Sequence, residues 1–174
     1  GDGTLGLIET VYDPRRGVLT PLRSLPELLN GLSFLEGKFP THRAFSEATL
    51  DDVLHLHPAK PHRFNTTELR SLVLLNRGDH FDASPLPLEA QLSPAFTPVI
   101  ADFNGDGFED VFLSQNYFAT RPGVPRMDAG RGLLLLGDGR GQFQSVNGED
   151  SGLMIYGEQR GAATADFDRD GRAD

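Results

Sequence analysis

Oxygen-bearing side chains recur at a fixed spacing in residues 102–110. They stand at positions 1, 3, 5 and 9 of this stretch, as Asp102, Asn104, Asp106 and Asp110. Position 6 is Gly107, and a glycine there allows the tight turn that folds such a loop back on itself. Carboxylate and amide oxygens that converge in this way are ligands for a hard cation. The spacing therefore predicts a cation-binding loop.

The donor set of this loop favours calcium over zinc. The backbone carbonyl of Phe108 falls at position 7 and adds a fifth oxygen source, and water would complete the six to eight oxygens that calcium takes. The chain has no Cys, which excludes thiolate metal sites. An EF-hand would carry a bidentate Glu at position 12, but that position is Leu113, inside an apolar run. We therefore expect a calcium loop flanked by strands.

The same pattern occurs a second time, 64 residues later. Residues 101–107 return as residues 165–171, with Gly171 at the turn. The second set of predicted ligands is Asp166, Asp168, Asp170, Asp174 and the backbone carbonyl of Arg172. The alternative is that Asp and Gly only build Asx-type turns between strands, since both residues favour such turns without an ion. Two matching copies favour the calcium interpretation.

Strands are needed to hold these loops, and the sequence predicts several short ones. With 20 Gly and 12 Pro, the composition favours a mainly β domain over a helical bundle. The predicted strands are residues 69–75, 111–114, 133–136 and 142–146. Turns at residues 76–79 and 137–141 separate them, and residues 116–130 form a loop insertion. Short strands with Gly and Asp turns are typical of a β-propeller built from four-stranded antiparallel blades.

Two segments near the start of the chain have helical rather than strand periodicity. Ser24 and Glu27 form a predicted capping box, and leucines at helical spacing follow before Gly37. A second helical stretch is expected at about residues 42–55, with a cap from Thr49 and Asp52, and prolines end it. We therefore expect a helical insertion in an otherwise β-rich chain.

These elements predict five parts along a partial propeller. Residues 1–23 are expected to end one blade and to start inside a loop, in which Asp2 would hold position 5 but Gly6 holds position 9, so no strong site is expected. The remaining parts are the helical insertion at 24–64, blade strands at 65–98, a blade with the first calcium loop at 99–160, and the start of the next blade with the second loop at 161–174.

Composition excludes several classes of function. The formal net charge is −9 and the 16 Lys and Arg residues form no run, so a general nucleic-acid binder is not expected. The longest apolar run, residues 133–136, is far below the roughly 20 residues of a transmembrane helix. We expect no membrane span in this chain, and any export signal would lie upstream.

The Asp loops resemble those of FG-GAP/VCBS repeats, found in integrin α-subunit-like β-propellers. Residues 161–163, Gly-Ala-Ala, look like the GAP element that precedes such a loop. Residues 86–94, which run into the first loop, are similar to bacterial exported FG-GAP proteins of the ASPIC/UnbV-related group. The resemblance implies a calcium-binding propeller segment that is extracellular, on the cell surface or periplasmic. It implies a role in adhesion, surface architecture or ligand display.

The partner implied by this resemblance is a protein or glycan ligand, further copies of the chain, or the rest of a longer parent chain. The rival hypothesis is a calcium-dependent propeller enzyme that acts on polysaccharide, such as a lyase. Its candidate residues are Tyr117, Arg121, Arg126 and Arg131, and a glycan-binding or packing role explains them equally well. No nucleophile motif or phosphate loop accompanies them. We therefore expect a binding or structural module and not an enzyme.

Two further motifs have simpler interpretations. His55 and His57 could share a metal, but no further ligand stands nearby in the sequence, so a surface role is expected. Residues 77–79 spell Arg-Gly-Asp, a tripeptide that some integrins bind. They fill a predicted hairpin turn, and a structural role is expected for them as well.

Overall fold

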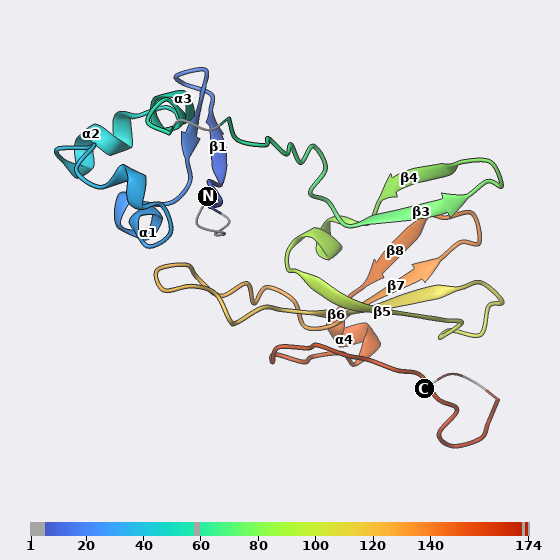
Figure 1. Cartoon of the computed structure of the whole chain (residues 1–174). Coiled ribbons are helices and arrows are strands. Elements are labelled where there is room, and N and C mark those ends of the chain that lie inside the picture. Colours follow the sequence, from blue (N-terminus) through green and yellow to red (C-terminus); the bar gives the residue numbers. More distant parts are fainter. Residues whose placement is uncertain (1–5, 58–59, 172, 174) are drawn as a thin grey trace. The chain divides into compact units, whose positions relative to one another are not determined.

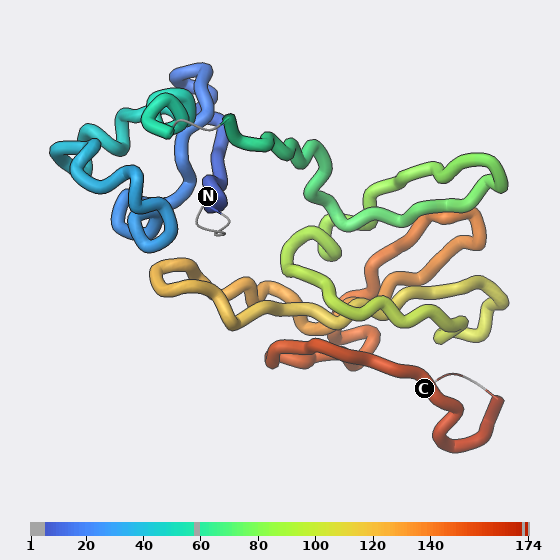
Figure 2. The backbone as a smooth tube through the Cα atoms, in the orientation of Figure 1, coloured from blue at the N-terminus to red at the C-terminus, as the bar shows by residue number. Residues whose placement is uncertain are grey.

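The computed structural model describes residues 6–57, 60–171 and 173 (Figure 1). The chain divides into two compact units, Gly1–Asn65 and Thr66–Asp174. The first unit carries most of the helices, and the second carries most of the strands. Figure 2 shows the same division in the path of the backbone.

Over its described residues, the first unit combines one hairpin with four short helical segments. Strand β1 (Thr10–Asp13) pairs with β2 (Val18–Pro21) in antiparallel register. The turn between them is closed by a hydrogen bond from the Gly17 N–H to the Asp13 carbonyl, 2.8 Å long. The helical segments that follow are α1 (Leu25–Leu29), the 3-10 helix η1 (Ser33–Leu35), α2 (His42–Glu47) and α3 (Leu50–Leu54).

The two predicted helices are each divided into two pieces. Between α1 and η1 lie Asn30 and Gly31, which are poor helix formers. Between α2 and α3 lies Thr49, whose hydroxyl accepts the N–H of Asp52 at 3.1 Å and so begins a new helix. The prediction of two continuous helices was therefore wrong, because each one is divided into shorter helices. The predicted capping residues Ser24 and Thr49 do begin helices.

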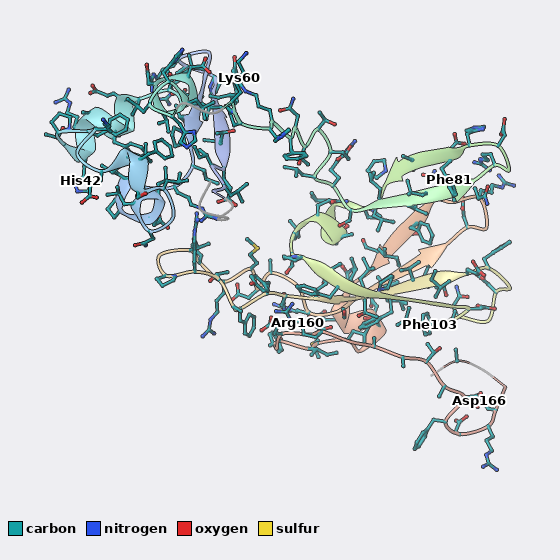
Figure 3. All side chains as sticks on the ribbon, in the orientation of Figure 1. His42, Lys60, Phe81, Phe103, Arg160 and Asp166 are labelled. Atoms are coloured by element: carbon teal, nitrogen blue, oxygen red, sulfur yellow. The ribbon has the colours of Figure 1, made fainter. Side chains whose placement is uncertain are left out.

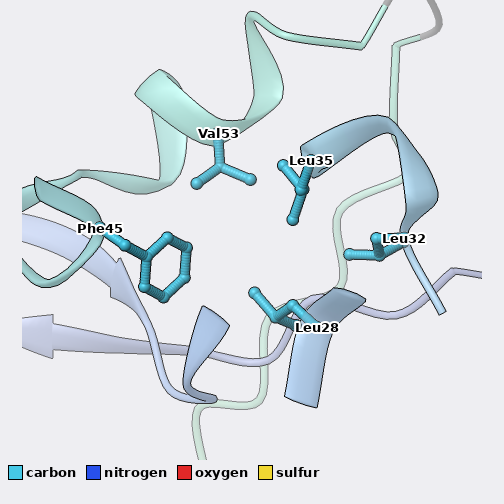
Figure 4. Close-up of a cluster of buried hydrophobic side chains, with 5 residues drawn as sticks. All are labelled: Leu28, Leu32, Leu35, Phe45 and Val53. Carbon is cyan, nitrogen blue, oxygen red and sulfur yellow. The ribbon is translucent and has the colours of Figure 1, made fainter. Parts of the chain in front are cut away.

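A small apolar core holds the first unit together. Its buried members converge from the separate helical segments, as Figure 4 shows for Leu28, Leu32, Leu35, Phe45 and Val53. Val53 is completely buried and Leu35 is 1% exposed. Ile8 and Phe39 pack against this cluster. Helices this short are stabilised mainly by the packing of their apolar faces, because isolated short helices are marginal in water.

The second unit contains a hairpin and a four-stranded antiparallel sheet. The hairpin pairs β3 (Leu72–Asn76) with β4 (Phe81–Pro85), and the 3-10 helix η2 (Leu88–Gln91) follows it. The sheet has the strand order β5-β6-β7-β8. Its strands are β5 (Ala95–Ala101), β6 (Asp110–Gln115), β7 (Leu133–Gly137) and β8 (Phe143–Val146). The short helix α4 (Gly148–Ser151) comes after β8.

One face of this sheet forms the core of the second unit. Leu113 of β6 stands opposite Leu133 of β7, and both are buried. Leu135, two residues along β7, is completely buried, as is Ala90 of η2. Alternate residues of a strand point to the same face, which explains the two-residue spacing of these leucines. Edge strand β5 contains Pro98, a residue that sheets tolerate at their edges.

The fold class expected from the sequence is confirmed at the level of a mainly β chain with antiparallel sheets and few helices. Over the described ranges, the strands form two hairpins and one four-stranded sheet and do not close into a ring. None of the helices in the described part of the chain is long and apolar enough to cross a membrane.

Candidate metal centre

The first Asp loop connects strands β5 and β6, and its backbone is held by the side chain of its first residue. One oxygen of Asp102, Oδ1, accepts the N–H of Gly105 at 2.7 Å and that of Asp106 at 3.1 Å. The other oxygen, Oδ2, accepts the N–H of Gly107 at 2.9 Å. Both glycines have positive φ, 76° and 86°, which glycine adopts without the Cβ strain of other residues. The loop is therefore curled tightly around Asp102.

The middle of the loop brings Asn104 and Asp106 together. The Asn104 Oδ1 accepts the N–H of Asp106 at 2.9 Å, and the Asn104 amide donates to the Asp106 Oδ2 at 2.8 Å. The Asp106 Oδ1 accepts the N–H of Phe108 at 2.8 Å. Both side chains are exposed to solvent, so their oxygens are accessible to an ion. The predicted ligands at positions 1, 3 and 5 thus lie in one small loop.

Asp110 differs from the other predicted ligands because it is completely buried. Its Oδ2 accepts the N–H of Phe103 at 3.0 Å, and its Oδ1 accepts the N–H of Gly137 at 2.9 Å. The first bond closes the loop on itself, and the second ties the loop to the end of β7. Asp110 therefore tethers the loop through both carboxylate oxygens, and only their remaining lone pairs are open to an ion.

The second Asp loop repeats the backbone geometry of the first. The N–H of Gly171 donates to Asp166 Oδ2 at 3.0 Å, which matches the bond from Gly107 to Asp102. The N–H of Asp170 donates to Asp168 Oδ1 at 3.1 Å, which matches the bond from Asp106 to Asn104. Positive φ recurs at the same two positions, 65° at Arg169 and 87° at Gly171. Two loops 64 residues apart therefore adopt the same turn.

The three acidic side chains of the second loop form a cluster. Asp166, Asp168 and Asp170 are exposed, and one oxygen from each lies within 4.8 Å of the others. Two oxygens bound to the same calcium ion at about 2.3 to 2.6 Å lie at most about 5 Å apart, so this spacing fits one ion. The predicted ligands Arg172 and Asp174 lie outside the described residues.

The two loops differ in charge at their centres. Positions 1, 3 and 5 supply two carboxylates and an amide in the first loop, but three carboxylates in the second. Carboxylates held this close repel one another, and a bound cation removes that repulsion. Position 4 is Arg169 in the second loop and Gly105 in the first, so the second loop also carries one more positive charge.

The ring of Phe108 helps to fix the first loop on the sheet. It lies against Gly139, in the turn between β7 and β8, at a place where any Cβ would collide with it. The same turn contains Asp138, which accepts the N–H groups of Arg140 at 2.8 Å and Gln142 at 3.0 Å. These hydrogen bonds lower the pKa of Asp138 below its usual value. Its carboxylate therefore stabilises the turn.

The residues of the rival enzyme hypothesis lie at the other end of the sheet. The backbone of Tyr117 pairs with that of Met127 in an isolated bridge, so residues 117–127 form a hairpin-like extension of β6. The Arg126 guanidinium lies 5.1 Å from the Phe118 ring centroid, and that of Arg131 lies 5.0 Å from the Tyr156 ring centroid. These residues are therefore separate from the Asp loops.

The two motifs given simpler interpretations each have local partners. The His55 ring contacts the Asp51 carbonyl at 2.6 Å through Nδ1, while the His57 ring packs edge-on against Phe34, with centroids 4.7 Å apart. In the Arg-Gly-Asp turn, Arg77 forms an ion pair with Asp82 at 2.7 Å. The N–H of Gly78 donates to the Asn76 side chain, as in a hairpin turn.

Asn116 is a structural residue that the sequence analysis did not single out. It is completely buried, has a positive φ of 82°, and its amide donates to the carbonyls of Gly130 and Gly157 at 2.9 and 3.0 Å. Its Oδ1 accepts the Ser93 hydroxyl and the Gly130 N–H. Asn at the end of an apolar strand is the only local signal, since all these partners are distant in sequence.

No protein-family model, curated protein or solved structure matches the chain.

Proposed function

We propose that this chain is a calcium-binding FG-GAP/VCBS-type propeller segment of an extracellular structural, adhesion or ligand-binding protein. The observation that carries the proposal is the repeated loop, in which matching side chains and matching backbone dihedrals occur 64 residues apart. Chance or simple turn preference would produce one such loop more readily than two with the same hydrogen bonds.

The donor chemistry supports calcium as the ion. The loops offer carboxylate and amide oxygens, which are hard ligands, and neither contains a His or Cys. The spacing of the acidic oxygens in the second loop fits one ion. Asp102, Asn104, Asp106 and the Phe108 carbonyl would hold calcium in the first loop, with Asp110 as the fifth predicted source.

The proposed role of calcium is structural. The first loop spans β5 and β6 and is already tied to β7 through Asp110. An ion bound to the loop would cross-link its two halves and add its binding free energy to the stability of the folded state. At a free calcium concentration about 100 times Kd, that gain is about 2.7 kcal/mol for each site. Calcium outside the cytoplasm would keep such sites filled.

The four-stranded sheet supports the propeller part of the proposal. Strands β5 to β8 follow one another in the sheet in chain order, which is the arrangement of a propeller blade. The β3–β4 hairpin precedes this sheet, and its apolar Leu74 and Phe81 are 59% and 64% exposed. In a propeller, neighbouring blades cover the apolar side chains of a blade. The absence of such neighbours would explain why Leu74 and Phe81 are exposed.

We place the chain among binding and structural modules and not among enzymes. The oxygen donors of the loops are assigned to calcium, and the arginines of the rival hypothesis lie beside aromatic rings. This arrangement fits packing or ligand contact as readily as catalysis. A module of this kind has a protein or glycan as its partner.

The test is calcium titration of the full chain by calorimetry, together with thermal unfolding in calcium and in chelator. We expect two binding events, a higher Tm in calcium, and a smaller difference between the two conditions for Asp106→Ala. The Glu149→Ala variant changes an exposed acidic residue outside both loops and serves as the control. An unchanged Tm on chelation, with no heat of binding, would show that the loops are simple Asx turns.

A further inference from the structure

The two ends of the four-stranded sheet carry different chemistry. The Asp102 loop joins the end of β5 to the start of β6, whereas residues 116–132 join the end of β6 to the start of β7. Because these strands are antiparallel, the two connections lie at opposite ends of the sheet. Figure 3 shows this separation between Phe103 of the first loop and Arg160. We name the second end, with residues 116–132 and 155–160, the arginine end.

Aromatic rings hold the guanidinium groups at the arginine end. Arg126 lies over Phe118 and Arg131 over Tyr156, within the roughly 6 Å range of cation–π attraction. Arg160 lies 4.2 Å from the Phe96 centroid and 4.9 Å from that of Tyr117, and it also forms an ion pair with Glu158. An arginine held against a ring still presents N–H groups to a planar anion such as a carboxylate.

A groove of about 570 Å³ opens at the arginine end, between η2 with the residues after it and residues 126–129. This volume falls in the range of roughly 300 to 1,000 Å³ that small-ligand sites occupy. Its charged lining residues are Arg126 and Asp128, and its apolar ones include Leu92 and Met127, which are 55% and 45% exposed.

Partly buried hydrogen bonds connect the residues that line the groove. The hydroxyl of Ser93 donates to the Met127 carbonyl at 3.1 Å, and Gln91 exchanges two hydrogen bonds with the backbone of Ser71. The Asn116 side chain holds the start of the arginine end in place, because its Oδ1 accepts the Ser93 hydroxyl and the Gly130 N–H. The groove is therefore a built feature of the second unit.

We infer that this groove binds an acidic oligosaccharide, with uronic-acid units as the recognised chemistry. Arg126 would hold a sugar carboxylate through charge-assisted hydrogen bonds. Asp128 would accept hydrogen bonds from ring hydroxyls, and Leu92 and Met127 would cover the apolar face of a sugar ring. The inference names the ligand class of the proposed module and rests on the proposed function in that respect.

The opposite charges of Arg126 and Asp128 favour a saccharide over an acidic peptide. An acidic peptide and an oligogalacturonate each carry one carboxylate per unit, so Arg126 attracts both ligands and Asp128 repels both. The two ligands differ in their donors, because each uronic-acid unit also offers hydroxyls to the Asp128 carboxylate and an acidic side chain offers none. Both charges in the groove are then matched by one ligand.

Calorimetry on the full chain tests the inference, with a tetramer of α-1,4-linked galacturonic acid as the probe. Its methyl ester, which lacks the negative charge, is the comparison ligand. We expect the acid to bind in chelator as well as in calcium, and the ester to bind at least about tenfold more weakly. Arg126→Gln should weaken the binding of the acid by about tenfold or more, because a charge-assisted hydrogen bond is lost.

Two variants act as controls. Arg140→Gln removes an exposed arginine from the turn at the opposite end of the sheet and should leave binding unchanged. Asp128→Ala should weaken binding of the galacturonate tetramer and strengthen binding of tetraglutamate. An unchanged Tm for each variant shows that it folds.

Three results would overturn the inference. One is the absence of tetramer binding by a chain that binds calcium, which leaves the proposed function in place. Another is binding that requires calcium and disappears in Asp106→Ala, since the sugar carboxylates would then be held at the Asp loops. The third is equal binding of tetraglutamate, which would assign the groove to acidic peptides.

Discussion

Asp106 and Asp110 belong to one loop, yet their carboxylates have different surroundings. Asp106 is exposed and bonded within the loop, to Asn104 and Phe108. Asp110 is completely buried and accepts two backbone N–H groups, one of them from another strand. At the scale of single residues, the same side chain therefore acts as a proposed ion ligand at one position and as a tether at the other.

Replacement of Asp110 by Ala should destabilise the second unit with or without calcium. The change leaves the partly buried N–H groups of Phe103 and Gly137 without their acceptor, at the lower end of about 1 to 3 kcal/mol for each group. Thermal unfolding in chelator is the measurement, with Asp106→Ala as the matched variant that should lose little stability there. Equal loss of stability in both variants in chelator would remove the distinction between ligand and tether.

Arg169 holds a left-handed conformation that suits glycine, the residue at the equivalent position of the first loop. Arg169→Gly should stabilise the second loop by up to about 1 kcal/mol in calcium and in chelator alike, because the left-handed strain is already present in the curled loop. Thermal unfolding in both conditions is the measurement. Arg169→Ala removes the charge but keeps the strain, and it is the control. An equal gain in stability in both variants would show that the effect comes from the loss of the positive charge and not from relief of backbone strain.

At the scale of elements, strand positions were easier to predict than helix lengths. The apolar runs at 111–114 and 133–136 lie inside β6 and β7, because each is flanked by turn residues and its side chains fill one core. The long helix expected after Ser24 is broken at Asn30 and Gly31. Apolar spacing alone could not show this break, since residues of a broken helix can still pack into one core.

The cap of α3 gives a pH dependence with a defined sign. Hydrogen bonds from the Thr49 N–H and hydroxyl lower the pKa of Asp52 below its usual value of 3.8. A lowered pKa means that the folded state favours the carboxylate. Its contribution to stability is present above pH 3.8 and is lost as the pH falls through the lowered pKa.

Asp52→Ala should therefore lower the Tm at about pH 6, and the difference from the parent chain should vanish under strongly acidic conditions. Circular dichroism during heating is the measurement. Thr49→Ala, which removes the hydroxyl of the same cap, should cost about 1 kcal/mol and reduce the effect of a further Asp52→Ala change. A difference that grows as the pH falls would contradict the sign.

At the scale of the whole molecule, the chain consists of two units, with residues 60–69 in no regular structure and exposed to solvent. Limited trypsin digestion should cut first after Arg63, because exposed segments without backbone pairing are the preferred sites of cleavage. The expected fragment starting at Phe64 should keep its calcium-dependent Tm. Mass spectrometry identifies the cut, and first cleavage inside β5 to β8 would contradict this division.

The candidate site was predictable where its contacts are local and not where they are distant. The closeness of the predicted ligands Asp102, Asn104 and Asp106 follows from their spacing, since each lies within a few residues of the next. The bond from Asp110 to Gly137 and the groove beside Arg126 depend on which strands become neighbours. That pairing is decided by the packing of the whole sheet, which a reading of one segment does not contain.

The matching backbone conformation of the two Asp loops bears on how fast an ion would bind to them and leave. Each loop is already curled by backbone N–H groups that donate to its first side chain, so an arriving ion would find the turn already formed. In the first loop, the amide of Asn104 would give up its bond to Asp106, while Asp102 and Asp110 would keep the backbone N–H groups that they already accept. Little backbone rearrangement would then slow association, and differences in affinity between the loops would appear mainly as different ion residence times.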